Sequence, residues 1–391
     1  MNNEGQCKSQ NTIYGTILAI IVFVTVISQI PFFVIRGLSS PISMAAWGVG
    51  IVSCFLVRRG DIVLRRVRMP IGLALVFFFF YMLLGLLDET YWKSHIPRYL
   101  GLSIGILIIG NMSGGVLTKN DFKRILSAYI VATLIMSLTV YQTYYLGLVS
   151  FGTRNYLYDE KNSTALILVS AMIIITTTRL ESSKLLKLVY IVADVFLAVL
   201  VLLMRSRAVY VGVGFSLLIL LRSRELGAKL KWFLFAAILA ITAYLVMNPD
   251  KLGELLDVYV FAGRSATNLN DLSSGRAIEW QNFWSDLGDD WLLGHGRMKR
   301  ETLVLTSILE FGFPLGCLLI YLGFYPLLFG LWNFRRVSKE RILYMTIAVC
   351  YVSNLFFEQL APFGPGAKCF LLWLLIGIFA ARTPNMERLI E

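Results

Sequence analysis

Long apolar runs recur along almost the whole chain, and this recurrence limits the possible folds more than any other feature. A helix needs roughly 17–25 mainly apolar residues to cross a bilayer. Of the 391 residues, 57% are hydrophobic and 15% are charged, whereas soluble domains have about 25% charged residues. About twelve runs approach span length, at 13–35, 41–57, 69–87, 100–117, 125–147, 163–178, 186–204, 208–221, 232–248, 302–332, 341–358 and 367–381. The sequence therefore predicts an all-α polytopic membrane protein with a single transmembrane domain over residues 1–391.

Basic residues gather in alternate connections between these runs, and this asymmetry predicts an orientation. The rich connections contain Arg58, Arg59, Arg65, Arg66 and Arg68; Lys119, Lys123 and Arg124; Arg179, Lys184 and Lys187; Arg222, Arg224, Lys229 and Lys231; and Arg335, Arg336, Lys339 and Arg341. By the positive-inside rule they face the cytoplasm. Both termini are then expected in the cytoplasm, and the long polar stretch 249–301 outside. Since this rule explains the net charge of +12, we expect no nucleic-acid partner.

The stretch 249–301, between the predicted ninth and tenth spans, has helical patterns of its own. Asp250 can cap a helix that ends near Gly263, and a second helix is expected after Ser274. Their apolar residues recur at helical spacing and are Leu252, Leu255, Leu256 and Tyr259 in the first, and Trp280, Phe283, Trp284 and Leu287 in the second. Two alternatives fit these amphipathic helices: a lid lying on the bilayer, or a pair packed on the bundle of spans.

Arginine and glycine are placed where a second loop helix would bind an anion. Gly275 and Arg276 fall at its start, where unpaired amides and the positive end of the helix dipole favour negative charge. Arg264 lies in the preceding turn, and guanidinium groups match phosphate oxygens in a bidentate geometry. The alternative is that these arginines are only solvated or face lipid.

Metal chemistry has no support in the sequence. The histidines are His95 and His295, and the five cysteines, none of them in the long loop, are Cys7, Cys54, Cys317, Cys350 and Cys369. Neither set has the spacing of a metal site or a disulfide framework. We therefore expect no metal and no cofactor.

Three segments of the second half together resemble one known family. They are Ser274-Gly275-Arg276-Ala-Ile-Glu-Trp280, Trp291-Leu-Leu-Gly294-His295-Gly296 and Leu309-Glu310-Phe311-Gly312-Phe313-Pro314. These segments resemble the O-antigen polymerase and O-antigen ligase superfamily. The ten residues between Arg264 and Gly275 resemble a motif of the polymerase branch. Asn162, before the sixth run, and Ser206-Arg207, after the seventh, resemble further family positions.

The resemblance implies a GT-C-like membrane glycosyltransferase in the bacterial inner membrane, with a periplasmic active site. It would transfer a glycan, with inversion and without a metal, from undecaprenyl diphosphate to a sugar acceptor. Both substrates would be lipid-linked oligosaccharides, and a chain-length regulator and a flippase are possible membrane partners. Fixed cations would stabilise the diphosphate leaving group. The candidates for this role are Arg207, Arg264 and Arg276 with Gly275, followed by Arg154 and Arg205.

A proton acceptor for the attacking hydroxyl is the remaining requirement. Ligases of the family carry a histidine-asparagine pair nine residues before a Glu-x-Gly motif. Counting back from Glu310 reaches Glu301 and Thr302, so the pair is absent and the polymerase branch is favoured over the ligase. Glu301 is the candidate base, with a plain loop carboxylate as the alternative reading. His295, Asn162 and Glu358 are assigned to the acceptor groove.

A transporter or flippase of lipid-linked sugars is the alternative from another functional class. Transporters place polar residues near the bilayer midplane, often in paired repeats. This chain has no visible repeat and concentrates its polar residues in one loop.

Acidic residues also fall within or at the edge of three runs, at Asp194, Glu310 and Glu358, where a charge usually marks function or a buried pairing.

Overall fold

The computed structural model describes residues 3–57, 66–147, 156–178, 183–222, 247–255, 275–298, 300–333, 338–364 and 368–382, with residues 239, 243, 244 and 273. Within these ranges every regular element is a helix. Six helical segments there are long and apolar enough to cross a membrane: Arg68–Leu87, Ile96–Gly114, Lys119–Tyr145, Lys161–Thr178, Lys184–Leu203 and Leu303–Asn333. The chain is thus an α-helical membrane-embedded protein, as its apolar runs predict. The predicted span 232–248 lies largely outside the described residues.

Most helices begin and end close to the bounds that the apolar runs suggest. The first run, 13–35, is an exception, because α1 ends at Ile27 and a separate helix begins at Pro31, where a proline cannot continue a helix. In chain order they are α1 (Asn3–Ile27), α2 (Pro31–Ile35), α3 (Ser39–Val57), α4 (Arg68–Leu87), η1 (Tyr91–Lys93), α5 (Ile96–Gly114), α6 (Lys119–Val140), η2 (Tyr141–Tyr145), α7 (Tyr156–Thr178), α8 (Lys184–Leu203), α9 (Arg207–Arg222), α11 (Pro249–Leu255), α13 (Arg276–Leu287), α14 (Leu303–Asn333), α15 (Lys339–Ser353), η5 (Asn354–Phe356) and α16 (Phe370–Ala381). Side-chain caps explain several starts, because Thr118 and Ser183 accept amides of the first turns of α6 and α8,.

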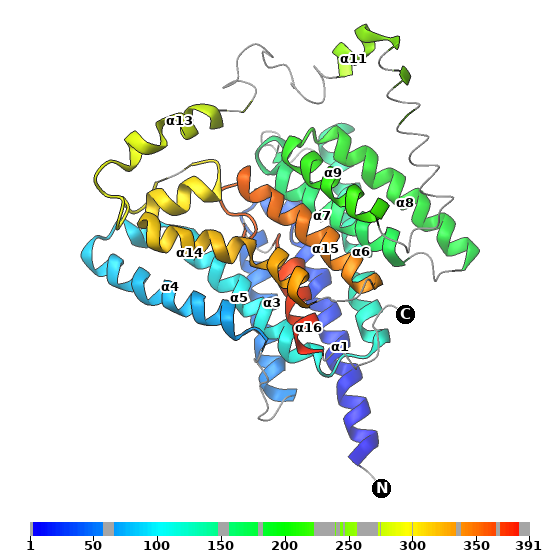
Figure 1. Cartoon of the computed structure of the whole chain (residues 1–391). Coiled ribbons are helices and arrows are strands. Elements are labelled where there is room, and N and C mark those ends of the chain that lie inside the picture. The colour runs from blue at the N-terminus through cyan, green and yellow to red at the C-terminus, as the bar shows by residue number, and fades with distance from the viewer. Residues whose placement is uncertain are drawn as a thin grey trace.

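The short helix α16 lies in the middle of the bundle (Figure 1), and its residues from Phe370 to Ala380 are all buried. It packs against α5 so closely that the two backbones touch. A Cβ on Gly110 would lie 2.5 Å from the Leu374 carbonyl oxygen, and one on Gly377 would lie 2.3 Å from that of Leu107. Small residues allow this approach between membrane helices. The pair α5–α16 is therefore a closely packed part of the core.

Two outer helices keep apolar side chains exposed. Leu86 on α4 is 79% exposed and Leu185 on α8 is 74% exposed, and the two helices lie at opposite edges of the view in Figure 1. Soluble proteins rarely leave apolar surface of this extent uncovered. These faces are those of helices surrounded by lipid.

The long helix α14 contains a break that receives a neighbouring loop. Gly312 has φ 72° and ψ 175°, a conformation that is essentially restricted to glycine. At this break the amide of His295 donates to the Leu309 carbonyl over 2.8 Å, and that of Gly296 donates to the Glu310 carbonyl over 3.1 Å. A Cβ on Gly294 would lie 2.5 Å from the Gly312 nitrogen. The two glycine-bearing segments found in the sequence therefore pack against each other.

The helix α13 confirms the second helix predicted for the polar loop. Phe283 and Leu287 are buried on one face of α13, against apolar residues of α14. Trp280 and Trp284, on the same predicted stripe, are 46% and 69% exposed. The helix is therefore packed on α14 through part of its stripe, and its tryptophans remain open. The first loop helix is described only as α11, Pro249–Leu255, and its predicted end near Gly263 lies outside the described residues.

Candidate anion-binding and acid–base site

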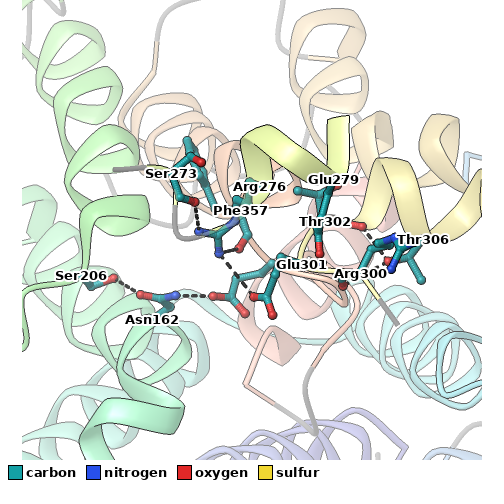
Figure 2. Close-up of polar contacts among 11 residues, drawn as sticks. Asn162, Ser206, Ser273, Arg276, Glu279, Arg300, Glu301, Thr302, Thr306 and Phe357 are labelled. Carbon is teal, nitrogen blue, oxygen red and sulfur yellow. Dashed lines mark hydrogen bonds and ion pairs between the residues drawn. The ribbon is translucent and has the colours of Figure 1, made fainter. Parts of the chain in front are cut away.

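The guanidinium of Arg276 lies at the N-terminus of α13 and forms the centre of a polar cluster (Figure 2). Gly275 precedes it with φ 89°, a conformation that glycine adopts without a steric cost. Ser273 Oγ accepts the amide of Ala277 over 2.9 Å, which satisfies one free donor of the first turn. The helix therefore starts where the sequence predicts, with an arginine as its first residue.

Two backbone carbonyls hold the Arg276 side chain. Its Nη1 donates to the Ser273 carbonyl over 3.2 Å, and its Nη2 donates to the Phe357 carbonyl over 2.6 Å. The side chain is only 17% exposed. Its Nε is buried and has no hydrogen-bond partner among the described residues. A buried donor without a partner costs free energy, so an anion that accepted a hydrogen bond from this Nε would stabilise the site.

Glu301 is the carboxylate of the cluster that pairs with Arg276 among the described residues. Its Oε2 lies 3.6 Å from Arg276 Nη2, and its side chain is 53% exposed. Its amide donates to Glu279 Oε2 over 3.1 Å, which ties the start of α14 to the first turn of α13. An ion pair with one exposed partner is weak. Another anion can therefore replace Glu301 at Arg276 at small cost.

Glu358 is the second carboxylate, and a chain of side chains leads to it from α7 and α9. Ser206 Oγ donates to Asn162 Oδ1 over 2.6 Å, and Asn162 Nδ2 donates to Glu358 Oε1. Figure 2 shows Ser206 and Asn162 in line toward the cluster of Arg276 and Glu301. Because Ser206 occupies the amide oxygen, the amide nitrogen of Asn162 must face Glu358.

Burial raises the pKa of the Glu358 carboxyl above its ordinary value. The hydrogen bond from Asn162 and the charges of Arg276 and Lys161 lower this pKa, whereas the negative charge of Glu301 raises it further. Burial is the largest of these effects, since removal from water disfavours the charged form. The site thus holds one exposed carboxylate that pairs with arginine and one half-buried carboxyl, that of Glu358, with increased proton affinity.

Several residues singled out in the sequence meet at this cluster, and others do not. Arg276 pairs with Glu301, Asn162 donates to Glu358, and Arg276 also donates to the carbonyl of Phe357, the residue before Glu358. Arg205 and Arg207 flank Ser206, so their backbone lies at its edge, and Arg205 adopts φ 51°. Arg154 and Arg264 lie outside the described residues.

His295 lies away from Arg276, beside the other end of α13. Its Nε2 is 3.1 Å from the Leu287 carbonyl oxygen, and its Nδ1 is 3.1 Å from Asp290 Oδ2. Leu287 is eleven residues beyond Arg276 along the helix, a rise of about 16 Å. Among the described residues, His295 therefore makes no contact with the Arg276 cluster, and its place in the acceptor groove stays a prediction.

Glu310 belongs to a separate polar cluster at the break in α14. It accepts the Ser94 hydroxyl over 2.5 Å at Oε2 and the Met298 amide over 3.2 Å at Oε1. Both of its oxygens hold neighbouring segments in place. Its position in an apolar run therefore reflects a buried pairing rather than a place in the Arg276 cluster.

Some polar contacts of the site were not expected from the sequence. Glu279 and the Phe357 carbonyl had no sequence signal beyond their proximity to Arg276 and Glu358. Lys368 is buried, and its Nζ donates to Ser163 over 3.1 Å beside Asn162. A lysine at the edge of an apolar run was the only signal available for it. The described residues contain no group of three His, Cys, Asp or Glu side chains suited to a metal ion.

The fold and the cluster together define the class of protein. It is a helical membrane protein with a half-buried arginine at a helix N-terminus and two carboxyl groups beside it. A scan against protein-family models finds no match, and a search of curated proteins finds no similar sequence. The chemistry of the cluster is that of an anion site with a neighbouring proton acceptor.

Proposed function

We propose that this chain is a bacterial inner-membrane polymerase that joins undecaprenyl-diphosphate-linked oligosaccharide repeats into a surface polysaccharide of the O-antigen or capsule type. In this proposal it has about twelve spans, as the apolar runs predict, and a GT-C-like architecture. The loop 249–301 and the Arg276 cluster face the periplasm, and both termini face the cytoplasm. The reaction is an inverting glycosyl transfer that needs no metal.

One observation carries the proposal: a half-buried arginine at a helix N-terminus and next to carboxyl groups, whose Nε has no partner among the described residues. A lipid diphosphate leaving group gains negative charge as its bond to the sugar breaks. Fixed cations and helix N-termini stabilise such charge where water is scarce. Arg276 has this role in the proposal. Arg205 and Arg207 would join it from the edge, and Arg154 and Arg264 are further candidates on sequence grounds.

The test is a polymerisation assay with the purified full-length chain in nanodiscs. The probe is the lipid-linked oligosaccharide fraction extracted from cells in which the gene of this chain is deleted. We expect a ladder of longer glycans with the wild-type protein, and the same ladder after addition of EDTA. No ladder from a folded wild-type protein would contradict the proposal.

Variants of Arg276 connect the assay to the cluster. Removal of one donor to developing charge lowers the rate by roughly 10²–10³, so we expect this loss in Arg276→Ala. Arg276→Lys should recover little, because it keeps the charge and loses the planar fork. Arg98→Ala is the control, since Arg98 is an exposed arginine whose hydrogen bonds go to Ser40 and Met44.

Cells that lack the chain separate the polymerase from its alternatives. A polymerase mutant should accumulate single repeats exposed in the periplasm. A ligase mutant should contain long polymer that is not attached to lipid A–core. A flippase mutant should retain its lipid-linked repeats at the cytoplasmic face.

A further inference from the structure

Two carboxyl groups flank Arg276, and the proposed transfer needs one of them to accept a proton. Glu301 is the candidate from the sequence, yet its side chain is half exposed and paired with Arg276. A carboxylate that neutralises the arginine competes with the diphosphate for the same guanidinium. Its position suits a group that holds the cation until the substrate arrives.

Glu358 is placed differently. It lies in the segment after η5, and its carbonyl accepts the amide of Leu303 over 3.2 Å. Asn162 donates a hydrogen bond to Oε1. Oε2 accepts no hydrogen bond among the described residues, and it is not one of the fully covered polar atoms there that lack a partner. One carboxyl oxygen is thus fixed by the protein and the other remains open.

We infer that Glu358 is the catalytic base of the proposed reaction, that its open Oε2 accepts the proton of the attacking sugar hydroxyl, and that Asn162 and Ser206 position it. This inference rests on the proposed function. The hydroxyl oxygen forms a bond to the anomeric carbon of the donor sugar as the hydroxyl proton moves to Glu358. The bond between that carbon and the diphosphate oxygen breaks, and its electron pair leaves with the diphosphate, beside Arg276. The protonated Glu358 then returns its proton to water.

Burial supports this assignment because it increases the proton affinity of Glu358. A general base works best when its pKa approaches the working pH. The charged and titratable groups that face the Glu358 carboxyl among the described residues are Arg276 on α13, Glu301 before α14, Lys161 on α7 and Cys369 before α16.

The deciding experiment measures the initial polymerisation rate against pH, with the extracted lipid-linked oligosaccharides as probe. The rate should rise with pH as Glu358 loses its proton, which gives an acidic limb. Glu358→Gln should lower the rate by roughly 10²–10⁴, the usual contribution of a general base. It should still bind undecaprenyl diphosphate, because Arg276 is intact. Glu89→Gln is the control, since Glu89 is an exposed carboxylate paired with Lys93.

Variants around Glu358 give the assignment a second test that does not depend on the folding of Glu358→Gln. Asn162→Ala removes a bond that lowers the pKa of Glu358, so the acidic limb should move to higher pH. Ser206→Ala should move it in the same direction by a smaller amount. Glu301→Gln removes a charge that raises this pKa, so the limb should move to lower pH.

Failure of this inference is distinct from failure of the proposed function. A Glu358→Gln rate within about threefold of wild type would refute the role of Glu358 alone. Acidic limbs that stay in place in Asn162→Ala and Glu301→Gln would refute it as well. Absence of any ladder with the wild-type protein would refute the proposed function and the role of Glu358 with it.

Discussion

Replacement of Gly312 by alanine should destabilise the protein more than any other single methyl addition at the α14 break. The new Cβ would lie 2.2 Å from the Leu292 carbonyl oxygen, and the backbone already has a positive φ of 72°. Strain of this kind costs about 1–3 kcal/mol. The loop must also move away, which breaks the hydrogen bonds from His295 and Gly296 and the one from the Phe313 amide to Trp291 over 2.8 Å.

Each of these backbone bonds contributes about 0.5–1.5 kcal/mol. With the backbone strain, Gly312→Ala should lower the free energy of unfolding by about 2.5–7.5 kcal/mol. Tryptophan fluorescence during unfolding in mixed detergent micelles measures this change. Gly72→Ala is the matched control, because its Cβ would meet no atom within 4 Å, and helix propensity predicts a gain of up to about 1 kcal/mol. A Gly312→Ala value within about 0.5 kcal/mol of wild type would show that the break does not hold the loop.

Three further predictions concern α13, the orientation and Glu358. Phe283→Ala should cost about 3–5 kcal/mol of unfolding free energy in the same micelles, since the side chain is buried,, whereas Trp280→Ala should change it little; equal effects would contradict the packing of α13. Reporter fusions at position 270 should report the periplasm and those at 63 and 227 the cytoplasm, and the reverse pattern would overturn the orientation. The folded-state pKa of Glu358 is raised, so its contribution to stability is complete below about pH 4.3 and is lost as pH rises through the folded pKa,. The difference in unfolding free energy between wild type and Glu358→Gln should therefore depend on pH. A difference that stays constant with pH would argue against the raised pKa.

The pattern of residues along short stretches of sequence predicted the local structure of those stretches. Apolar length predicted membrane helices, and the spacing of Phe283 and Leu287 predicted α13. The placement of Gly275 and Arg276 predicted an arginine at a helix start. Each of these features follows from a few consecutive turns of chain, where periodicity and capping act.

Contacts between segments far apart in the sequence could not be predicted from such local patterns. Asn162 and Glu358 are 196 residues apart, and neither has a local signal for the other. The glycines of residues 294–296 and Gly312 were visible only as a resemblance. Their physical reason, the touching backbones at the α14 break, appears once both segments are placed. Burial of Glu358 likewise depends on several helices at once, so its increased proton affinity had no sequence signature.

The cation and the proposed base are connected through the backbone as well as through their charges. Arg276 Nη2 is bonded to the carbonyl of Phe357, the residue before Glu358. The carbonyl of Glu358 accepts the amide of Leu303, the first residue of α14, and α13 packs on that same helix through Phe283. The separation of guanidinium and carboxyl is therefore set by the fold before any ligand binds. Groups held in place in advance need no reorganisation as charge develops, which is where electrostatic catalysis gains most.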